Sequence, residues 1–527
     1  MKKIFDFRDK KNERWLVIFF CFLLSFLLLI LCSKCSFLYP FNGWDDFNSF
    51  YTIGSGWANG LIPYRDLFEQ KGPFLYLIFM LGYLISPGKF IGIFFLEVIF
   101  LTGTLYFSSK IVDLFIDKKK RTYDRWLILV IYGLMLTTSI SFVEGGSSEE
   151  FNLLFTTISI FYLLKYLKSD DLVNIKYKDL IICGLCCGLS LMIKYTTVGL
   201  WFIMMTYICI RLIRLGRFKE AIFKGLVFIL MMFVPFGLFS LYFYVNDSLF
   251  DFLNTYFYIN IFKYSNGGGI LVGLIKSFKN ILAAFFSNIP LVCIFYIIFC
   301  YYLRKITNFN YRFKFDKKKR TFGLMILFSL VVLYYNQQFW PYAITAMFFI
   351  ILLVIIYLYR LFSEYKIFRF CCCGYIIFSL IFGVEYEYMM VDKKDVVQYR
   401  FAEIIKREEN ATLLQYRSID EGFYTASGIL PSNKYFEQVN IDSENLPDSY
   451  LEQDNIIRKK EVMFVVVRKY DMDRDGGYMD QTTNSKLGFN QKSSLEFINT
   501  YYELVDEYKN EVGYYNSCNY YLFKVRD

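Results

Sequence analysis

The chain has 527 residues, of which 56% are hydrophobic and 21% are aromatic, and its mean hydropathy is +0.36. A soluble core of this size could not bury so much apolar surface, so the composition excludes a soluble globular protein and indicates a polytopic membrane protein. The formal net charge is +10, and the sequence contains no histidine. Imidazole chemistry is therefore excluded, a zinc site is disfavoured, and carboxylates, lysines, arginines and tyrosines must carry any reaction.

The first apolar run predicts a transmembrane helix, and basic loops predict its direction. Residues 15–33 form a run of the length that a helix needs to cross a bilayer. Connections rich in lysine and arginine recur along the chain, and the positive-inside rule places them in the cytoplasm. They lie at 2–14, 110–121, 165–178, 211–219, 304–320 and 360–369. We therefore predict eleven crossings of a plasma membrane, with the N-terminus in the cytoplasm.

The same charge pattern places the remaining connections on the outer side of the membrane. They are residues 34–89, 144–149, the turn at Lys194, 246–279, 336–339 and everything after about 385. Residues 73–86, within the first of these loops, are apolar but begin with a proline and would span only about 21 Å as a helix. We expect this segment to be a juxtamembrane helix at the outer surface and not a crossing.

The composition changes after the last predicted crossing. Residues 388–527 alternate helix-like segments, LPDSYLEQDNIIRKK and SLEFINTYYELVDEYK, with strand-like ones, TLLQY, VMFVVV and YYLFKV. The sequence thus predicts an α-helical polytopic membrane domain at 1–387 and a small extracytoplasmic α/β domain at 388–527.

Charged residues are concentrated in the first outer loop, which contains GWDDFNSFYTIGSGWANGLIPYRDLFEQKGPFLYL from Gly43 onward. Asp45 and Asp46 follow the first crossing, and Lys71 lies just before the predicted surface helix. Glycine and proline turn signals between them indicate an ordered loop. The second outer loop, within GGSSEEFNLLF, places Glu149 and Glu150 at the start of the fourth crossing.

These two segments resemble outer loops of bacterial GT-C membrane glycosyltransferases, the group related to protein O-mannosyltransferases and to aminoarabinose transferases of lipid A. In that family an acid follows the first helix, a glycine-containing turn comes next, and a PYRD-F-KGP segment opens a surface helix. All three occur here in this order. Weaker matches are IKYTTVGLWF, YYNQQFWPYA and GFYTASGILPSNKYF.

The resemblance implies a fold of many helices around a lipid-accessible cavity, with juxtamembrane helices in the first outer loop. It also implies transfer of a hexose or pentose from a polyprenyl-phosphate donor to an acceptor on the outer face. A carboxylate would deprotonate or orient the acceptor, and cations would hold the departing phosphate. Asp46 aligns best with the family's acid, and Asp45 is the alternative.

The resemblance also suggests roles for other charged and aromatic residues. Phosphate-binding candidates are Lys71, Arg65 and Lys194. Glu149 or Glu150 would hold a sugar hydroxyl, orient a cation or assist the base. Candidates for the substrate pocket are Tyr64, Asp66, Glu69, Tyr335, Gln337 and Tyr342. Each has a structural alternative: the acids can cap helices, Lys71 can anchor the surface helix, and the outer aromatics fit an interfacial belt.

The partners and the reaction type are less narrowly defined. The donor would be a polyprenyl-phosphate sugar, the acceptor a glycan, lipid or protein, and the surroundings membrane lipids. The basic loops require no nucleic acid, because membrane orientation accounts for them. The family includes members with and without a divalent cation; a cation here would be bound by oxygen ligands, as Mg²⁺ or Mn²⁺ is, and we assign no metal ligand.

Three other functions compete with single-sugar transfer. A glycan polymerase or ligase would use the same lipid carrier and keep its reactive residues on the same face. A lipid-carrier flippase or transporter would place ionisable groups near the bilayer midplane on broken helices, often in two related halves. A receptor would need only an anchor, which eleven crossings exceed. The acids in outer loops and the PYRD and KGP segments favour the transferase.

Overall fold

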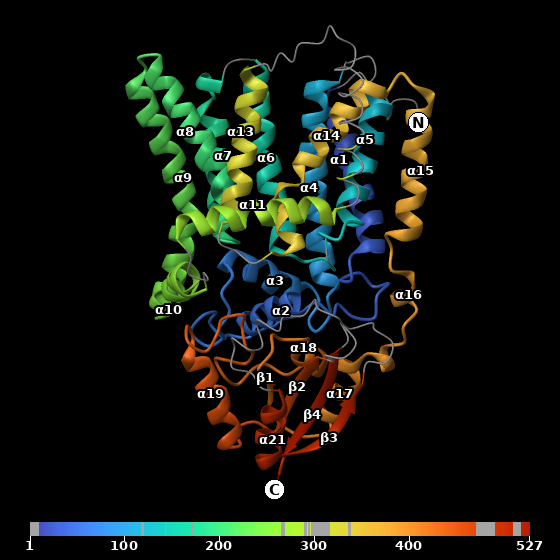
Figure 1. Ribbon diagram of the computed structural model, residues 1–527, viewed down its shortest axis with the longest axis vertical. Coiled ribbons are helices and arrows are strands. Elements are labelled where there is room, and N and C mark those ends of the chain that lie inside the picture. Colours follow the sequence, from blue (N-terminus) through green and yellow to red (C-terminus); the bar gives the residue numbers. More distant parts are fainter. Residues whose placement is uncertain are drawn as a thin grey trace. The chain divides into compact units, whose positions relative to one another are not determined.

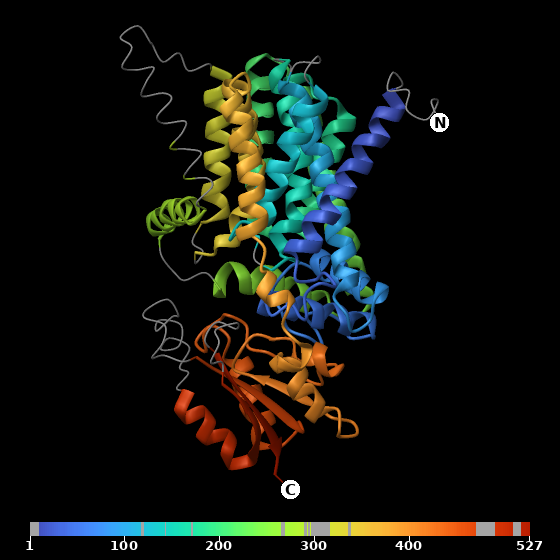
Figure 2. The same ribbon diagram turned by 90° about the vertical axis from the view of Figure 1, so that its right-hand side faces the viewer.

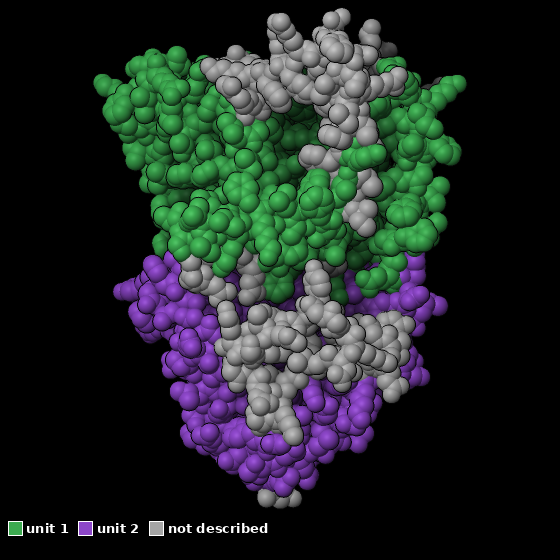
Figure 3. All heavy atoms as spheres, viewed as in Figure 1, with its two compact units in different colours: residues 1–33, 95–239, 267–385 green, residues 34–94, 240–266, 386–527 purple. Residues whose placement is uncertain are grey.

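The computed structural model divides the chain into two compact units, coloured separately in Figure 3. It describes residues 10–116, 121–142, 144–169, 172–264, 269–288, 292, 296, 317–335, 339–470, 491–509 and 518–526. Unit 1 comprises residues 1–33, 95–239 and 267–385, and unit 2 comprises residues 34–94, 240–266 and 386–527. Unit 2 therefore combines the predicted first outer loop with the C-terminal part of the chain. The predicted domain boundary after residue 387 stays a prediction.

Unit 1 consists of apolar helices, most of which run side by side in Figures 1 and 2, whereas α11 lies across their direction. The helices are α1 (Lys10–Cys32), α4 (Ile91–Phe115), α5 (Arg121–Thr137), α6 (Ser148–Lys168), α7 (Tyr177–Leu191), α8 (Gly199–Arg214), α9 (Phe218–Val245), α11 (Ile270–Ser287), α13 (Lys317–Leu333), α14 (Phe349–Phe362) and α15 (Lys366–Phe382). Large apolar side chains such as Phe202, Leu230 and Phe378 are exposed on them. Such surfaces are typical of helices that face lipid.

Length and composition identify five described helices that could cross a membrane. They are Glu13–Cys32, Ile91–Phe115, Tyr195–Arg214, Phe218–Val245 and Ile270–Ser287. A sixth is possible if Pro341–Met347 and Phe349–Phe362, which meet at 65°, form one broken span. The chain is thus a membrane protein, and the count of eleven crossings stays a prediction.

In unit 2, two helices of the segment 34–89 pack tightly against each other. They are α2 (Asp45–Ala58) and α3 (Pro73–Ile85). A Cβ at Gly54 would lie 2.7 Å from the backbone nitrogen of Met80, so the two backbones approach too closely for any larger residue. The predicted short helix beginning at Pro73 is confirmed. Proline suits this first helical position, because a backbone N–H there would have no partner within the helix.

The C-terminal part of unit 2 is built around a four-stranded sheet in the order β1-β2-β4-β3. The strands are β1 (Leu413–Tyr416), β2 (Phe464–Tyr470), β3 (Tyr502–Tyr508) and β4 (Cys518–Val525), and the main helices are α17 (Val397–Ile405), α18 (Phe423–Ser427), α19 (Pro447–Arg458) and α21 (Gln491–Tyr501). Strand β1 is parallel to β2, and the other pairs are antiparallel. The predicted strands TLLQY, VMFVVV and YYLFKV are confirmed as β1, β2 and β4.

One sequence prediction in this region is wrong. SLEFINTYYELVDEYK was expected to be one helix, but helix α21 ends at Tyr501 and strand β3 begins at Tyr502. The second half pairs with β4 along most of its length, so tertiary hydrogen bonding overrides a pattern that is compatible with a helix. The local sequence alone does not predict the pairing of β3 with β4.

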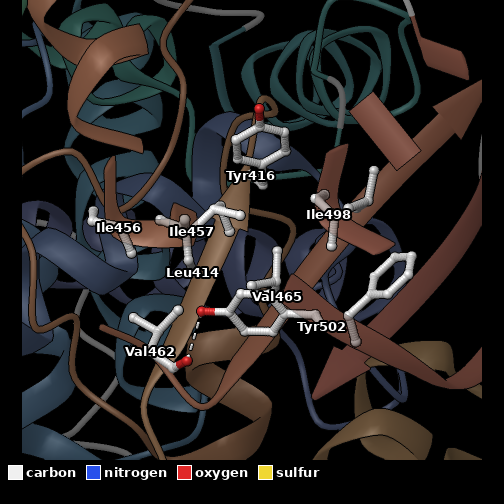
Figure 4. Packing of buried hydrophobic residues seen from close by; sticks show 10 residues of the cluster. Leu414, Tyr416, Ile456, Ile457, Val462, Val465, Ile498 and Tyr502 are labelled. Carbon is white, nitrogen blue, oxygen red and sulfur yellow. Dashed lines mark hydrogen bonds between the residues drawn. The ribbon is translucent and has the colours of Figure 1, made fainter. Parts of the chain in front are cut away.

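Helices α19 and α21 cover one face of the sheet. Figure 4 shows Ile457 of α19 and Ile498 of α21 packed among Leu414 and Val465 from the strands. Because strand side chains alternate between faces, Arg468, an odd number of residues from Val465, projects from the opposite face of β2. That face carries the charged residues described next.

Candidate active site

The two adjacent acids of the first loop form the first turn of α2, where they have different surroundings. The Asp46 backbone N–H donates to Asp45 Oδ1 at 2.9 Å, so the Asp45 carboxylate satisfies one N–H of this first turn. Acidic groups are favourable at a helix N-terminus because the backbone N–H groups there are unsatisfied. The Asp46 side chain is mostly buried, and its Oδ2 lies 3.7 Å from Lys71 Nζ. Asp45 therefore has the contact that the structural alternative expects, and the catalytic role of Asp46 stays a prediction.

Lys71 lies between two carboxylates. Its Nζ is 3.7 Å from Asp46 Oδ2 and 3.7 Å from Glu69 Oε1, and it lies 5.1 Å from the centre of the Phe50 ring. The Lys71 backbone N–H donates to Glu69 Oε2 at 2.8 Å, and the Tyr76 hydroxyl also donates to Glu69. Glu69 thus fixes the turn that carries Lys71. The structure brings Asp46, Glu69 and Lys71 together.

The PYRD turn, residues 63–66, contacts the backbone of Lys71. Tyr64 is fully buried with a left-handed backbone (φ 70°), and its hydroxyl donates to the Lys71 carbonyl at 2.7 Å. Arg65 contacts Asp66 at 2.8 Å and donates to the Asn246 carbonyl at 2.9 Å. The Arg65 guanidinium lowers the pKa of Asp66. Arg65 and Asp66 therefore stabilise the turn through their contact with each other. The predicted phosphate-binding residue Arg65 thus already has Asp66 as its partner.

Two buried carboxylates from the C-terminal part of unit 2 bind the middle of α2. Ser49 Oγ donates to Glu437 Oε1 at 2.6 Å, and Thr52 Oγ1 donates to Asp420 Oδ2 at 2.5 Å. The Asp420 backbone N–H donates to Glu437 Oε2 at 2.7 Å. Burial raises the pKa of Asp420 to about 6 and that of Glu437 well above its ordinary value.

A third buried acid, Glu421, forms an ion pair with Arg468 of β2. The Tyr520 hydroxyl of β4 donates to the same carboxylate. Burial raises the pKa of Glu421 to about 7, and Arg468 opposes the rise. Arg468 Nη1 also lies 3.7 Å from Asp45 Oδ2. Asp45 therefore has a cation from the C-terminal sheet, as Asp46 has Lys71.

Unit 1 contains a separate ion pair between two predicted site residues. Lys194 Nζ lies 2.6 Å from Glu149 Oε1, and Ser148 Oγ donates to Glu149 Oε2 at 2.7 Å. Glu149 is completely buried. The Lys194 ammonium also lies 5.9 Å from the centre of the Tyr342 ring. The structure thus brings Glu149, Lys194 and Tyr342 together.

Glu150 has a different environment from Glu149. Its backbone N–H donates to the Ser147 hydroxyl at 3.0 Å, and its Oε2 accepts from the Gly146 N–H at 2.9 Å. Serine at the N-cap with glutamate three residues later is a common helix-start pattern. Glu150 also hydrogen-bonds Glu97, which accepts from Ser33. Contacts of this kind favour a structural role for Glu150.

Four buried polar side chains lie close to Glu149 or Lys194 in the sequence, or on elements that pack against the turn after Lys194. Within the described ranges of the chain, the Asn152 amide and the hydroxyls of Ser190, Thr196 and Tyr334 are buried and have no hydrogen-bond partner. Asn152 follows Glu149 by three residues on α6, and the Ser190 carbonyl accepts from the Lys194 N–H at 2.9 Å. Buried polar groups of this kind usually have a protein, water or ligand partner.

Thr196 and Tyr334 come from adjoining elements. Thr196 lies in the turn Tyr195–Val198, which packs against both α7 and α13. Tyr334 directly follows α13, close enough to Glu149 for an electrostatic interaction. The predicted Tyr335 instead lies against α11, where a Cβ at Gly273 would be 2.7 Å from its ring. The predicted Gln337 lies outside the described residues.

Comparisons with known proteins identify the fold. No protein-family model matches the sequence, and no curated protein is similar enough to match. ArnT from Cupriavidus metallidurans bound to undecaprenyl phosphate has a similar structure, with 9% identity, a TM-score of 0.55 and coverage of 98% of both chains. ArnT in the apo state gives 10% identity, a TM-score of 0.56 and coverage of 97% of this chain and 98% of the other.

The protein therefore has the fold of the GT-C membrane glycosyltransferases, as the loop motifs predicted. The two ArnT structures each match over nearly the whole length of both chains. At this level of identity the likeness defines the fold, and the roles of individual residues depend on the geometry above.

No metal ligand set is evident in the part of the chain that the structure describes. There, no three histidine, cysteine, aspartate or glutamate side chains are arranged to hold an ion. Asp45, Asp46 and Glu149 instead lie beside Arg468, Lys71 and Lys194 respectively. We accordingly assign no step to Mg²⁺ or Mn²⁺.

Sequence reasoning missed the residues that the C-terminal part contributes. Asp420, Glu421 and Glu437 flank the weak match GFYTASGILPSNKYF, which was a usable signal. Arg468 could not be identified as a site residue from the sequence, because it is one of several basic residues in that region. The sequence favoured Tyr335, but Tyr334 is the buried residue of the two. Which tyrosine is buried depends on where α13 ends, and the sequence does not define that point.

The raised pKa of Asp420 makes unit 2 sensitive to pH. Its pKa rises from an ordinary 3.8 to about 6 in the folded protein. This shift corresponds to a preference of about 3 kcal/mol of the folded state for the protonated acid. Folding then favours the protonated acid, so this contribution is complete below about pH 4 and is lost as pH rises to about 6. We expect thermal stability in detergent to fall across this range and to fall less steeply in Asp420→Asn.

The control for this prediction is the exposed residue Asp395. Asp395→Asn should leave the slope of the apparent Tm against pH unchanged. Equal slopes in wild type and Asp420→Asn would show that the buried carboxyl does not titrate as described.

Proposed function

We propose that the protein transfers a sugar from a polyprenyl-phosphate donor to an acceptor on the outer face of the membrane. The observation that carries the proposal is the position of Asp46 Oδ2 only 3.7 Å from Lys71 Nζ, at the start of α2. A base for the acceptor and a cation for the phosphate are the two groups that the reaction requires. The GT-C fold supports the same assignment.

The proposed chemistry is a single displacement at the anomeric carbon. Asp46 accepts the proton of the acceptor hydroxyl while the acceptor oxygen forms a bond to the anomeric carbon. The bond between that carbon and the phosphate oxygen breaks, and its electron pair leaves with polyprenyl phosphate. Lys71 binds the phosphate and stabilises the negative charge that develops on it. Glu69 holds Lys71 in place through its contacts with the ammonium and the backbone N–H.

In unit 1, we assign the polar cluster around Glu149 and Lys194 as a second candidate site, described by itself, for a phosphate or a sugar group. Lys194 supplies a cation for phosphate or a donor for a sugar hydroxyl. The Asn152 amide has one donor and one acceptor group, which suits two neighbouring hydroxyls of a hexose or pentose. The completely buried Glu149 orients Lys194 through the 2.6 Å contact.

Asp46→Asn tests the assignment of the base. Turnover of the donor that wild type uses, chosen from a panel of radiolabelled polyprenyl-phosphate sugars, should fall by at least about 100-fold in matched membranes. Lys71→Ala should also lower kcat, since it removes charge stabilisation of the leaving group. The exposed Asp395→Asn provides a control for expression and charge.

Full activity of Asp46→Asn on a donor that wild type consumes would contradict the assignment. If Asp45→Asn were inactive in the same assay, the base would be Asp45. Transfer of preassembled oligosaccharides and not of single sugars would instead identify a ligase or polymerase.

Asn152→Leu tests the sugar-binding cluster while keeping the branched shape of the side chain. We expect KM for the donor to rise by about 10-fold, because one or two hydrogen bonds to the sugar are lost. Binding of polyprenyl phosphate without a sugar should stay within about two-fold of wild type. Thr157→Val is the matched control, since the Thr157 hydroxyl is already bonded to the Leu153 carbonyl at 2.7 Å. Equal weakening of sugar-free lipid binding would contradict a sugar-specific role.

A further inference from the structure

The sheet face opposite α19 and α21 carries two polar residues in register. Arg468 of β2 pairs directly with Tyr520 of β4, so both side chains project from the same face. Both contact the carboxylate of Glu421, Arg468 as an ion pair and Tyr520 through its hydroxyl. The Glu421 carbonyl accepts from the Gln398 side chain at 2.8 Å. Arg468 is therefore anchored by a rigid network within the C-terminal part of unit 2.

From this anchor Arg468 extends to the first turn of α2. Its Nη1 lies 3.7 Å from Asp45 Oδ2, and its side chain is only 15% exposed. Asp45 Oδ1 accepts from the Asp46 N–H, so the orientation of the Asp45 carboxylate is linked to the backbone of the proposed base. A continuous chain of contacts thus runs from Glu421 through Arg468 and Asp45 to Asp46.

The same segment of the C-terminal part contacts α2 at further points. Thr52 and Ser49 donate to Asp420 and Glu437, as described above. Gly422 has φ 88°, and a Cβ there would lie 2.6 Å from Asn48 Oδ1. The first three turns of α2 are therefore packed against residues 420–437 and β2.

Charge explains why an arginine is needed at this position. Asp45 and Asp46 are adjacent, and Glu421 adds a third acid that is buried near Asp45. Lys71 lies beside Asp46, and Arg468 lies between Asp45 and Glu421. Without Arg468, Asp45 and Glu421 would repel each other in a poorly solvated environment. The resulting shift of Asp45 would be transmitted to the first turn of α2.

We propose that Arg468, held by Glu421, is a positioning residue that orients Asp46 through Asp45, so the C-terminal sheet helps to assemble the active site. This inference rests on the proposed function, in which Asp46 is the base. Arg468 is not placed on the substrate. Its loss should therefore change kcat more than KM, and the first turn of α2 should become less ordered.

The test compares Arg468→Gln with Arg417→Gln in the full-length protein. Arg417 is a matched control, since it pairs with Asp454 at 2.6 Å elsewhere in the C-terminal part. With the donor that wild type uses, Arg468→Gln should lower kcat by about 10- to 100-fold and leave KM within about two-fold. Hydrogen exchange of a peptide covering residues 44–50 should become faster in Arg468→Gln and stay unchanged in Arg417→Gln.

A double variant distinguishes positioning from general loss of structure. Adding Asp45→Asn to Arg468→Gln removes the charge that Arg468 balances, so part of the lost kcat should return. Unchanged exchange at residues 44–50 together with wild-type kcat would overturn the inference. A large rise in KM with constant kcat would also overturn it, because Arg468 would then bind substrate directly.

The exchange measurement separates this inference from the proposed function. If wild type transfers no sugar from any donor, the proposed function fails. Faster exchange at residues 44–50 in Arg468→Gln would still support the positioning of α2 by Arg468, and unchanged exchange would overturn it.

Discussion

The structure of unit 2 depends on how two adjacent carboxylates at the start of α2 are balanced by cations. Asp46 lies beside Lys71 from the same loop, and Asp45 lies beside Arg468 from the C-terminal sheet. Like charges at neighbouring positions are costly unless each has a counter-charge or full solvation. The segment 34–89 and the C-terminal sheet both contribute to this arrangement, which is consistent with their grouping in one compact unit.

Buried hydrogen bonds hold the helix that carries these acids. The hydroxyls of Ser49 and Thr52 donate to Glu437 and Asp420, and burial favours the protonated form of both acids. Such groups stabilise the fold only while their hydrogen bonds are complete, and an incomplete network costs free energy. The order of α2 is thus coupled to the C-terminal part by contacts made through Ser49 and Thr52, which lie beyond the first turn that carries Asp46.

Short motifs in the sequence identified candidate site residues, whose catalytic and binding roles stay predictions. Asp46 and Lys71, and likewise Glu149 and Lys194, occur as two close pairs, and the helix beginning at Pro73 was expected. Arg468 could not be predicted, because its contact with Asp45 joins residues far apart in the chain and depends on the register of β2 with β4. Strand β3 was missed for the same reason, since pairing with β4 defines it.

The central claim is direct displacement of a lipid phosphate by an acceptor that Asp46 deprotonates. The most direct measurement is the anomeric configuration of the product, followed by nuclear magnetic resonance with a polyprenyl-phosphate sugar labelled at the anomeric carbon. A single displacement inverts that configuration and releases polyprenyl phosphate, which is the result we predict. Retention of configuration, with the sugar trapped covalently on Asp46 or Asp45, would show that the acid is a nucleophile and would contradict the account.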